Sequence, residues 1–468
     1  MRYLSTRGGA PTVGFDEAVL AGLAPDGGLY MPESWPQIAP TEIAAFATAP
    51  FTDIARRVIP PFIGDAVPAT DLSAIIASAW RGFGHPSVTP LVEIEPGHLL
   101  LELFHGPTLS FKDVAMQFLA PLMDLLLQAR AQRATLVVAT SGDTGSAAIE
   151  AFSGRERIDI VVLHPEGRVS DIQRRQMTTS TGANVQNIAV RGTFDDCQAL
   201  LKAMFGHEAF REAVSLSGVN SINWGRIVAQ LVYFFKAAAV LGAPQRKVAF
   251  TVPTGNFGDI FSAYAAMRMG LPVEGLVIAT NSNDILSRTL ASGRYEIQRV
   301  AATTSPSMDI QVSSNFERLL FEAGGRDGPG VAGMMGSLGQ SGGFDLPPAT
   351  LKTIKQHFWA KAATEFEVEA TIADVHARSG RLIDPHTAVG VAVARKHLNP
   401  GTAMVTLATA HPAKFPESVA KAAGISPRLP PHLAELQARA ERVTVLDNDQ
   451  AQVERFIAEK SRAGRKSK

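Results

Sequence analysis

Short runs of β-branched and small apolar residues alternate with amphipathic stretches along most of this chain. Three such runs, at residues 134–140, 158–165 and 183–190, predict strands. The stretches between and after them predict helices at 146–152, 170–178 and 194–205. This alternation strongly restricts the possible folds, because strands separated by helices pair in parallel.

The same alternation continues in the second half of the chain. Residues 247–253, 274–280 and 403–409 predict further strands, and residues 260–269 and 386–398 predict helices. The sequence therefore predicts an α/β protein with two open, mostly parallel sheets flanked by helices.

The pattern also suggests a division into three parts. Residues 1–95 predict a mostly helical N-terminal segment, residues 96–215 a smaller α/β domain, and residues 216–468 a larger one. Within the larger part, the glycine-rich residues 322–349 predict a mobile loop or an insertion.

Composition limits the kinds of partner. Lys+Arg and Asp+Glu balance at 44 each, so we expect no nucleic-acid partner, and the basic end at 459–468 predicts a frayed tail. The single cysteine, Cys197, predicts a reducing compartment and a small buried side chain. Residues 1–15 lack the apolar core of a signal peptide, and residues 227–243 predict a core helix rather than a membrane span. We therefore expect a cytoplasmic protein without a membrane partner.

Three loops follow predicted strands, where ligands bind in open α/β sheets. They are "TSGDTGSAA" at 140–148, "PTGNFGDI" at 253–260 and "ATAHPAKF" at 408–415. In the first two, glycines stand between a strand and a helix, so backbone amides at the helix N-terminus predict an anion site. A glycine there also simply relieves backbone strain, and this simpler explanation stays open for either loop alone.

One lysine, Lys112, stands where a loop becomes an apolar helix. The positive end of the helix dipole disfavours a cation there, so either the amine reaches solvent or it has a chemical role. A reactive lysine, a phosphate-binding loop and no metal-binding cluster together predict pyridoxal phosphate. That cofactor requires an amine for a Schiff base, an anion site for its phosphate and a partner for its ring nitrogen.

Six motifs then make a specific resemblance. They are "ELFHGPTLSFKD", "SGDTG", "NSINWGRIVAQ", "VPTGNFGD", "IDPHTAVG" and "TAHPAKF", in order between Glu102 and Phe415. Together they resemble the threonine synthase family of pyridoxal-phosphate-dependent lyases, which has fold type II, the tryptophan synthase β-like fold. The resemblance implies conversion of O-phospho-L-homoserine and water to L-threonine and phosphate by γ-elimination and β-addition of water. This is the last step of threonine biosynthesis, and we expect a monomer or a homodimer.

The resemblance also implies roles for cofactor-binding residues. Lys112 would carry the Schiff base and move protons, and Thr409 would face the ring nitrogen. Asp143 would lie beside the ring hydroxyl, with its protonation state left open. The phosphate loop would consist of Gly255, Asn256, Phe257, Gly258 and Asp259. We expect the Asp259 carboxylate to cap the following helix.

The substrate would be held by other residues. The resemblance makes Ser141 and Thr144 candidates for its carboxylate, and Asn223, Arg226 and Lys414 candidates for its phosphate. No metal site is expected, so His105, His386 and His411 would fix loops through hydrogen bonds. Residues 308–322 are assigned to packing.

Two alternatives remain at this stage. A serine/threonine dehydratase or a tryptophan-synthase-β-like lyase would use the same lysine and phosphate loop, although "HGPTLSFKD" and Asp143 argue against them. A protein that binds pyridoxal phosphate without catalysis is the second alternative.

Overall fold

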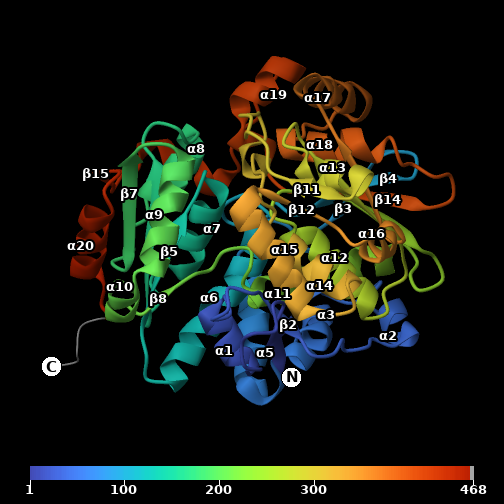
Figure 1. Ribbon diagram of the computed structural model, residues 1–468. Helices are drawn as coiled ribbons and strands as arrows, with labels where there is room; N and C mark the ends of the chain where they lie inside the picture. Colours follow the sequence, from blue (N-terminus) through green and yellow to red (C-terminus); the bar gives the residue numbers. More distant parts are fainter. Residues whose placement is uncertain (464–468) are drawn as a thin grey trace.

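The computed structural model describes residues 1–463 of the chain, so residues 464–468 of the predicted tail lie outside it. Two sheets lie on either side of a helical centre, and the N-terminal segment packs below them (Figure 1). The predicted α/β fold with mostly parallel sheets is confirmed.

The larger sheet has six strands in the order β13-β10-β9-β14-β4-β3. All neighbours are parallel except β3 and β4, which form an antiparallel pair at one edge. The strands are β3 (Leu91–Glu95), β4 (His98–Glu102), β9 (Val248–Pro253), β10 (Val273–Thr280), β13 (Phe358–Ala362) and β14 (Ala403–Ala408). The central strands β9 and β14 are almost wholly buried, as expected for parallel strands covered on both faces.

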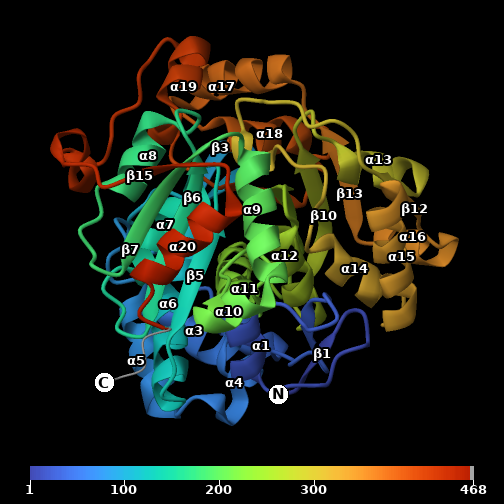
Figure 2. The same ribbon diagram turned by 60° about the vertical axis from the view of Figure 1, so that its left-hand side comes forward.

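The smaller sheet has five parallel strands in the order β15-β7-β6-β5-β8. They are β5 (Ala134–Ala139), β6 (Ile158–Pro165), β7 (Val185–Arg191), β8 (Leu216–Ser217) and β15 (Thr444–Asp447). The edge strand β15 comes from the C-terminal end of the chain and lies beside β7 in Figures 1 and 2.

The two sheets do not follow the predicted domain boundaries. Residues 96–215 include β4, which pairs with β14 of the larger sheet. Residues 216–468 include β15, which pairs with β7 of the smaller sheet. These pairings join strands that are hundreds of residues apart, so a pattern read along the chain does not show them.

The N-terminal segment is mostly helical, as predicted, with one short antiparallel strand pair. Its elements are β1 (Tyr3–Ser5), α1 (Phe15–Ala21), β2 (Tyr30–Pro32), α2 (Pro40–Ala45), α3 (Phe51–Val58), α4 (Pro60–Ile63) and α5 (Ala69–Ala79). Helices α1, α2 and α3 pack on the central helix α11, and these elements share one apolar core.

Helices cover both sheets, and the two long helices α6 and α11 pack against each other in the centre of the molecule. The helices near the smaller sheet are α6 (Lys112–Ala129), α7 (Asp143–Phe152), α8 (Asp171–Thr178), α9 (Phe194–Gly206), α10 (Glu208–Ala213) and α20 (Gln450–Lys460). Those near the larger sheet are α11 (Trp224–Val240), α12 (Gly258–Arg268), α13 (Ile285–Ser292), α14 (Phe316–Ala323), α16 (Pro348–Lys355), α17 (Glu365–Ser379), α18 (Pro385–Ala394) and α19 (Pro416–Ala423). Helix α6 packs against both α7 and α11, and its start contacts both the segment after β14 and the start of α7, through Phe111 and Lys112.

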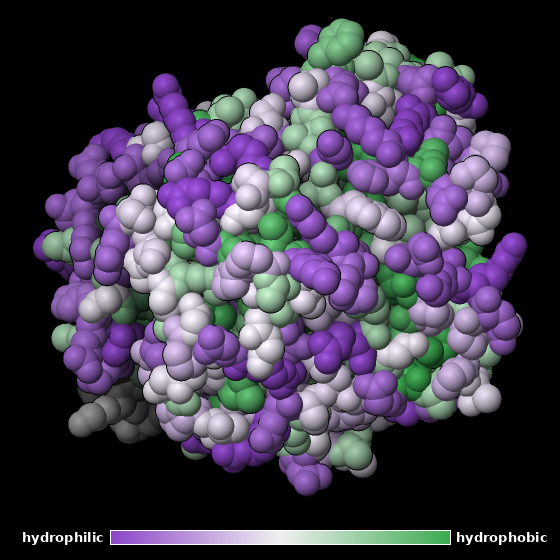
Figure 3. Space-filling view, turned by 45° about the vertical axis from the view of Figure 1, so that its right-hand side comes forward, coloured by the Kyte–Doolittle hydropathy of each residue, from purple (hydrophilic) through white to green (hydrophobic). Residues whose placement is uncertain are grey.

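Helix α11 is the predicted core helix, and nearly all of its residues are buried. Within residues 1–463, no helix has the length and apolar character required to cross a bilayer. The face shown in Figure 3 is mostly hydrophilic with scattered apolar patches, which is the pattern expected when large apolar side chains fill the core.

The glycine-rich residues 322–349 do not form the predicted loop. They contain helix α15 (Gly328–Ser341) and strand β12 (Gly343–Asp345), which pairs with β11 (Arg294–Glu296). The Asp327 side chain caps α15, and Gly342 ends it with φ of 73°. The helix forms because its apolar residues recur at helical spacing and pack on the main core; they are Val331, Met334, Met335 and Leu338.

Candidate active site

The loops that follow β5, β9 and β14 line a single cavity of about 560 Å³. It receives residues from both sheets and from the start of α6. Most of the site residues predicted from the sequence line it: Lys112, Ser141, Asp143, Thr144, Arg226, Gly255, Asn256, Phe257, Gly258, Asp259 and Thr409.

Lys112 is the first residue of α6, and the segment after β14 sets its position. The amide of Phe111 donates to the Thr409 carbonyl at 2.9 Å. Lys112 is only 7% exposed, and its Nζ lies 4.7 Å from the centre of the Phe111 ring. Burial lowers the pKa of the Lys112 amine, although the nearby Asp143 opposes that shift. A lysine with a lowered pKa is a better nucleophile and base at neutral pH.

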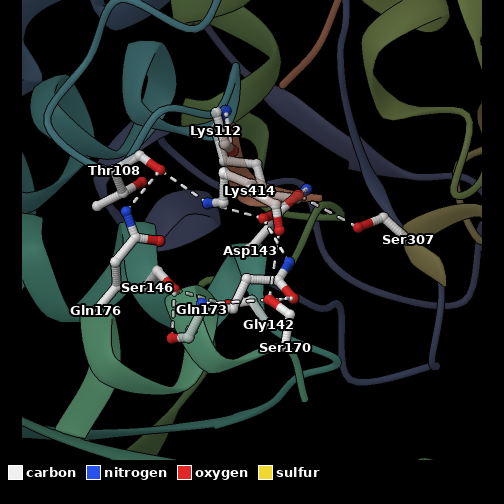
Figure 4. Close-up of polar contacts among 12 residues, drawn as sticks. Thr108, Lys112, Gly142, Asp143, Ser146, Ser170, Gln173, Gln176, Ser307 and Lys414 are labelled. Carbon is white, nitrogen blue, oxygen red and sulfur yellow. Dashed lines mark hydrogen bonds and ion pairs between the residues drawn. The ribbon is translucent and has the colours of Figure 1, made fainter. Parts of the chain in front are cut away.

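The Asp143 carboxylate is surrounded by hydrogen-bond donors (Figure 4). Its Oδ1 lies 2.8 Å from both Lys414 Nζ and Gln173 Nε2, and its Oδ2 lies 3.4 Å from both Lys112 Nζ and Ser307 Oγ. Burial alone would raise the pKa of Asp143, but Lys414 and Lys112 outweigh it and hold the pKa well below its usual range. These two lysines therefore favour the ionised form of the Asp143 carboxyl group.

Lys414 does not line the cavity, contrary to its predicted role toward the substrate phosphate. The residue is fully buried, and its Nζ donates to the Thr108 carbonyl at 2.7 Å as well as contacting Asp143. Its charge is therefore used to compensate Asp143. The prediction considered charge alone, whereas the packing of residues 412–414 turns the amine toward α7.

Asn223 is likewise absent from the residues that line the cavity. Its Oδ1 accepts from the Gly225 amide at 3.0 Å, which caps α11, and its Nδ2 donates to the Val19 carbonyl at 2.8 Å. Because both ends of this side chain bind the main chain, the structure gives it a capping role instead of the predicted substrate contact.

The loop between β9 and α12 exposes backbone amides to the cavity. The Gly255 carbonyl accepts from Ser313 Oγ at 2.6 Å, and the Asn256 carbonyl accepts from Asn315 Nδ2 at 2.9 Å. Within residues 1–463, the amides of residues 255–258 have no hydrogen-bond partner. With the carbonyls turned away and the amides free at the start of an 11-residue helix, the loop is suited to bind a phosphate.

The loop geometry depends on two residues in different ways. Phe257 has φ of 63°, so the left-handed conformation falls on a phenylalanine, whose ring is held among Phe316 and Phe358. A Cβ added at Gly255 would lie 2.9 Å from the Ser307 carbonyl oxygen, so only glycine fits there.

Asp259 does not cap α12, contrary to the prediction. Its carboxylate accepts a hydrogen bond from the Tyr233 hydroxyl of the neighbouring helix α11. Arg226 of α11 also lines the cavity, and it is near enough to Asp259 for its charge to lower the pKa of that carboxyl group. One polar atom of each, Asp259 Oδ2 and Arg226 Nε, is buried without a partner among residues 1–463.

Two parts of the cavity wall were missed by sequence reasoning. Residues 306–312, assigned in part to packing, line the cavity, and so does one side of α9; the α9 residues are Phe194, Asp195, Gln198, Leu201 and Lys202. Helical spacing from Phe194 to Lys202 was visible in the sequence, but nothing there showed which face would meet the cavity.

The three histidines take the predicted structural roles, and one of them also lines the cavity. His105 Nε2 lies 2.8 Å from Glu102 Oε2, and His411 Nδ1 accepts from the Ala413 amide. His386 lines the cavity with its Nδ1 2.7 Å from Asp384 Oδ2. No group of side chains within residues 1–463 has a geometry suited to a metal ion.

The cavity fits pyridoxal phosphate on the evidence of its own residues. Its lining includes a buried lysine amine and a loop with free backbone amides in which a Cβ at Gly255 would clash. It also includes a buried arginine N–H without a partner within residues 1–463. These are an attachment point and an anion site for that cofactor. Fold and site together define a pyridoxal-phosphate-dependent enzyme of fold type II.

Comparison with known proteins identifies the family of this chain. Residues 2–80 match the family model "Threonine synthase N terminus", residues 83–410 match "Pyridoxal-phosphate dependent enzyme", and residues 387–457 match "Threonine synthase, C-terminal". The chain belongs to the threonine synthase family. The predicted family, enzyme class and cofactor are thereby confirmed.

Relatives cover nearly the whole chain. The threonine synthase of Pseudomonas aeruginosa is 49% identical over 467 residues, covering 99% of this chain and all of the relative. The crystal structure of pyridoxal-phosphate-bound threonine synthase from Brucella melitensis is 56% identical, with a TM-score of 0.96 over 99% of this chain and 100% of that chain. A threonine deaminase from Solanum lycopersicum, at 14% identity over 76% of this chain and 93% of that chain and a TM-score of 0.50, shares the fold alone.

We expect Gly255→Ala to weaken cofactor binding by about 10-fold to 100-fold, since overpacking a tight site typically costs about 1–3 kcal/mol. The added methyl would press on the Ser307 carbonyl and displace the loop. Titration of cofactor-free protein with pyridoxal phosphate, followed by absorbance, measures the change.

Gly333→Ala is the matched control, because a Cβ at Gly333 in α15 meets no atom within 4 Å. Its cofactor affinity should equal that of the unmodified protein. Equal affinities for both variants would show that the loop at Gly255 does not hold the phosphate.

Proposed function

We propose that the enzyme converts O-phospho-L-homoserine and water to L-threonine and phosphate in this cavity. The observation that carries the proposal is the place of Lys112, whose buried amine lies 3.4 Å from Asp143 Oδ2 in the same cavity as the free amides of residues 255–258. Charge balance and a single cysteine suit the cytoplasm, where we propose that the enzyme acts as a monomer or a homodimer.

Bound pyridoxal phosphate supplies an electron sink for bonds at the α-carbon of an amino acid. Lys112 would hold the cofactor through its amine and, as a free amine, would take and return protons on that carbon. A free lysine with a pKa near about 10.4 is almost fully protonated at neutral pH and is a poor base. Burial lowers the pKa of Lys112 and so increases the fraction of neutral amine.

The remaining lining residues can orient the two ligands. We assign Thr409, whose side chain lines the cavity on the segment that holds Phe111, to the ring nitrogen. We assign Ser141 and Thr144 to the substrate carboxylate. Ser141 lies in the loop before α7, and Thr144 lies in the first turn of α7.

The substrate phosphate requires a cation distinct from those already used. Lys414 is engaged by Asp143, and Arg226 lies beside the loop that we assign to the cofactor phosphate. Lys202 of α9 lines the cavity and is exposed, so we propose it as the ligand of the substrate phosphate. Lys202→Gln should raise KM more than it lowers kcat, because it removes a binding contact.

The direct test is turnover of O-phospho-L-homoserine by the cofactor-loaded protein. Threonine and phosphate should appear in equal amounts, and borohydride reduction should fix the cofactor on Lys112. Formation of 2-oxobutanoate from L-threonine as the main activity would support the dehydratase alternative. Cofactor fixed on Lys112 without turnover of either substrate would support the catalytically inactive alternative.

A further inference from the structure

Two buried polar atoms of residues that line the cavity lack hydrogen-bond partners within residues 1–463, and they are of opposite chemical type. Arg226 Nε is a donor on α11, and Asp259 Oδ2 is an acceptor on α12. Arg226 is 3% exposed and Asp259 is 7% exposed, and both line the cavity. Unpartnered buried polar groups are costly, so such a pair points to a ligand that binds both.

Arg226 is a cation with little local compensation. Its Nη1 donates to the Val219 carbonyl at 3.3 Å, and it forms no ion pair within residues 1–463. Burial lowers the pKa of its guanidinium to about 10, which still leaves it charged at neutral pH. A buried guanidinium beside free amides is a suitable partner for a phosphate oxygen.

Asp259 is less easily explained, because a carboxylate repels a phosphate. It faces the Tyr233 hydroxyl and Arg226 of α11 and Lys112 of α6. Burial raises the pKa of Asp259 to about 7, despite opposing effects of these neighbours. A protonated carboxyl group would have an O–H donor at Oδ2 and would no longer repel an anion.

We propose that Asp259 binds the phosphate of the cofactor as a neutral acid, with Oδ2 donating to a phosphate oxygen while Arg226 supplies the cation. The proton comes from solvent and stays on the Asp259 carboxyl group. This inference rests on the proposed assignment of residues 255–259 to the cofactor phosphate.

The affinity for a phosphorylated ligand should fall as the pH rises, because ligand binding and protonation of Asp259 are coupled. A phosphate ester has a second pKa near about 6, so it is mainly a dianion at alkaline pH. Its charge raises the pKa of Asp259 further when it binds, so the complex holds a proton that the free protein has partly lost. Affinity for a phosphorylated ligand should therefore fall by up to about tenfold per pH unit above neutral pH, until the raised pKa is reached.

The test uses pyridoxine 5′-phosphate, which lacks the aldehyde and so cannot react with Lys112. Calorimetric titration of full-length, cofactor-free protein near about pH 8 in two buffers of different ionisation enthalpy reports the protons taken up. The unmodified protein should take up most of one proton. Absence of uptake in the unmodified protein would overturn the proposal without reference to any variant.

Asp259→Asn supplies a neutral donor of the same shape. It should bind with little proton uptake, with affinity almost independent of pH, and more tightly than the unmodified protein at alkaline pH. Asp195→Asn, which changes an exposed acid of α9 on the same cavity, is the control and should retain the uptake. Uptake that persists in Asp259→Asn would place the proton on another group and overturn the proposal.

Tyr233→Phe gives a second, independent shift. The Tyr233 hydroxyl donates to the Asp259 carboxylate and so favours its ionised form. Its loss should move the uptake to higher pH, and an unmoved profile would contradict the role of Asp259. If pyridoxine 5′-phosphate fails to bind at any pH, the assignment of the phosphate loop itself is wrong; binding without uptake at Asp259 refutes only this inference.

Discussion

Lys112→Ala is expected to lower kcat/KM for O-phospho-L-homoserine by about 10³-fold or more. The change removes both the amine that attaches the cofactor and the group that moves protons on the α-carbon, and a general base alone contributes about 10²-fold to 10⁴-fold. Pyridoxal phosphate should still bind without covalent attachment, because the free amides of residues 255–258 are unaffected. Phosphate release at saturating cofactor measures the loss.

Lys421→Ala is the matched control for this variant. Lys421 is an exposed lysine whose Nζ lies 2.6 Å from Glu369 Oε2, and it does not line the cavity. Surface ion pairs contribute little, so both turnover and cofactor binding should stay unchanged. Near-normal turnover by Lys112→Ala would refute the catalytic role of Lys112.

Lys414→Met is expected to have the largest effect on stability. It leaves the buried Asp143 carboxylate without the cation at 2.8 Å, and breaking one side of a buried pair typically lowers the free energy of unfolding by about 3–5 kcal/mol. Lys112 remains near Asp143 in the cofactor-free protein, so we expect about 3 kcal/mol there. Urea unfolding followed by tryptophan fluorescence provides the measurement.

The loss of stability in Lys414→Met should be greatest at neutral pH and smaller in acid. The pKa of Asp143 is depressed in the folded protein, so its ion pairs stabilise the fold above the unfolded pKa of about 3.9 and lose that effect as pH falls toward the depressed value. The difference in stability between the unmodified protein and Lys414→Met should therefore be complete at neutral pH and shrink in acid.

The double variant Lys414→Met/Asp143→Asn separates charge from packing. Removing both charges should restore part of the lost stability, because no unpaired carboxylate remains buried. Activity should stay low in the double variant, since Asp143 faces Lys112 in the cavity. A double variant no more stable than Lys414→Met alone would show that the pair does not act through charge.

Much of the regular structure was predictable from local pattern. The strand predicted at 158–165 coincides with β6, and residues 227–240 of the predicted core helix lie within the buried helix α11. Helix α15 was missed because its glycines suggested a loop, whereas four apolar side chains that pack on the core decide its conformation. Strand β15 was missed because its partner β7 lies about 250 residues away in the chain.

The candidate site was likewise predictable only where local sequence decides the structure. The sequence by itself determined that Lys112 begins an apolar helix and that glycine-containing loops follow β5 and β9, because spacing and residue type act locally. Only the tertiary structure decided which charged groups face the cavity. Lys414 bonds to Thr108, 306 residues away, and so compensates Asp143. A side chain's direction depends on the elements packed around it, and that packing is not written in the residues beside it.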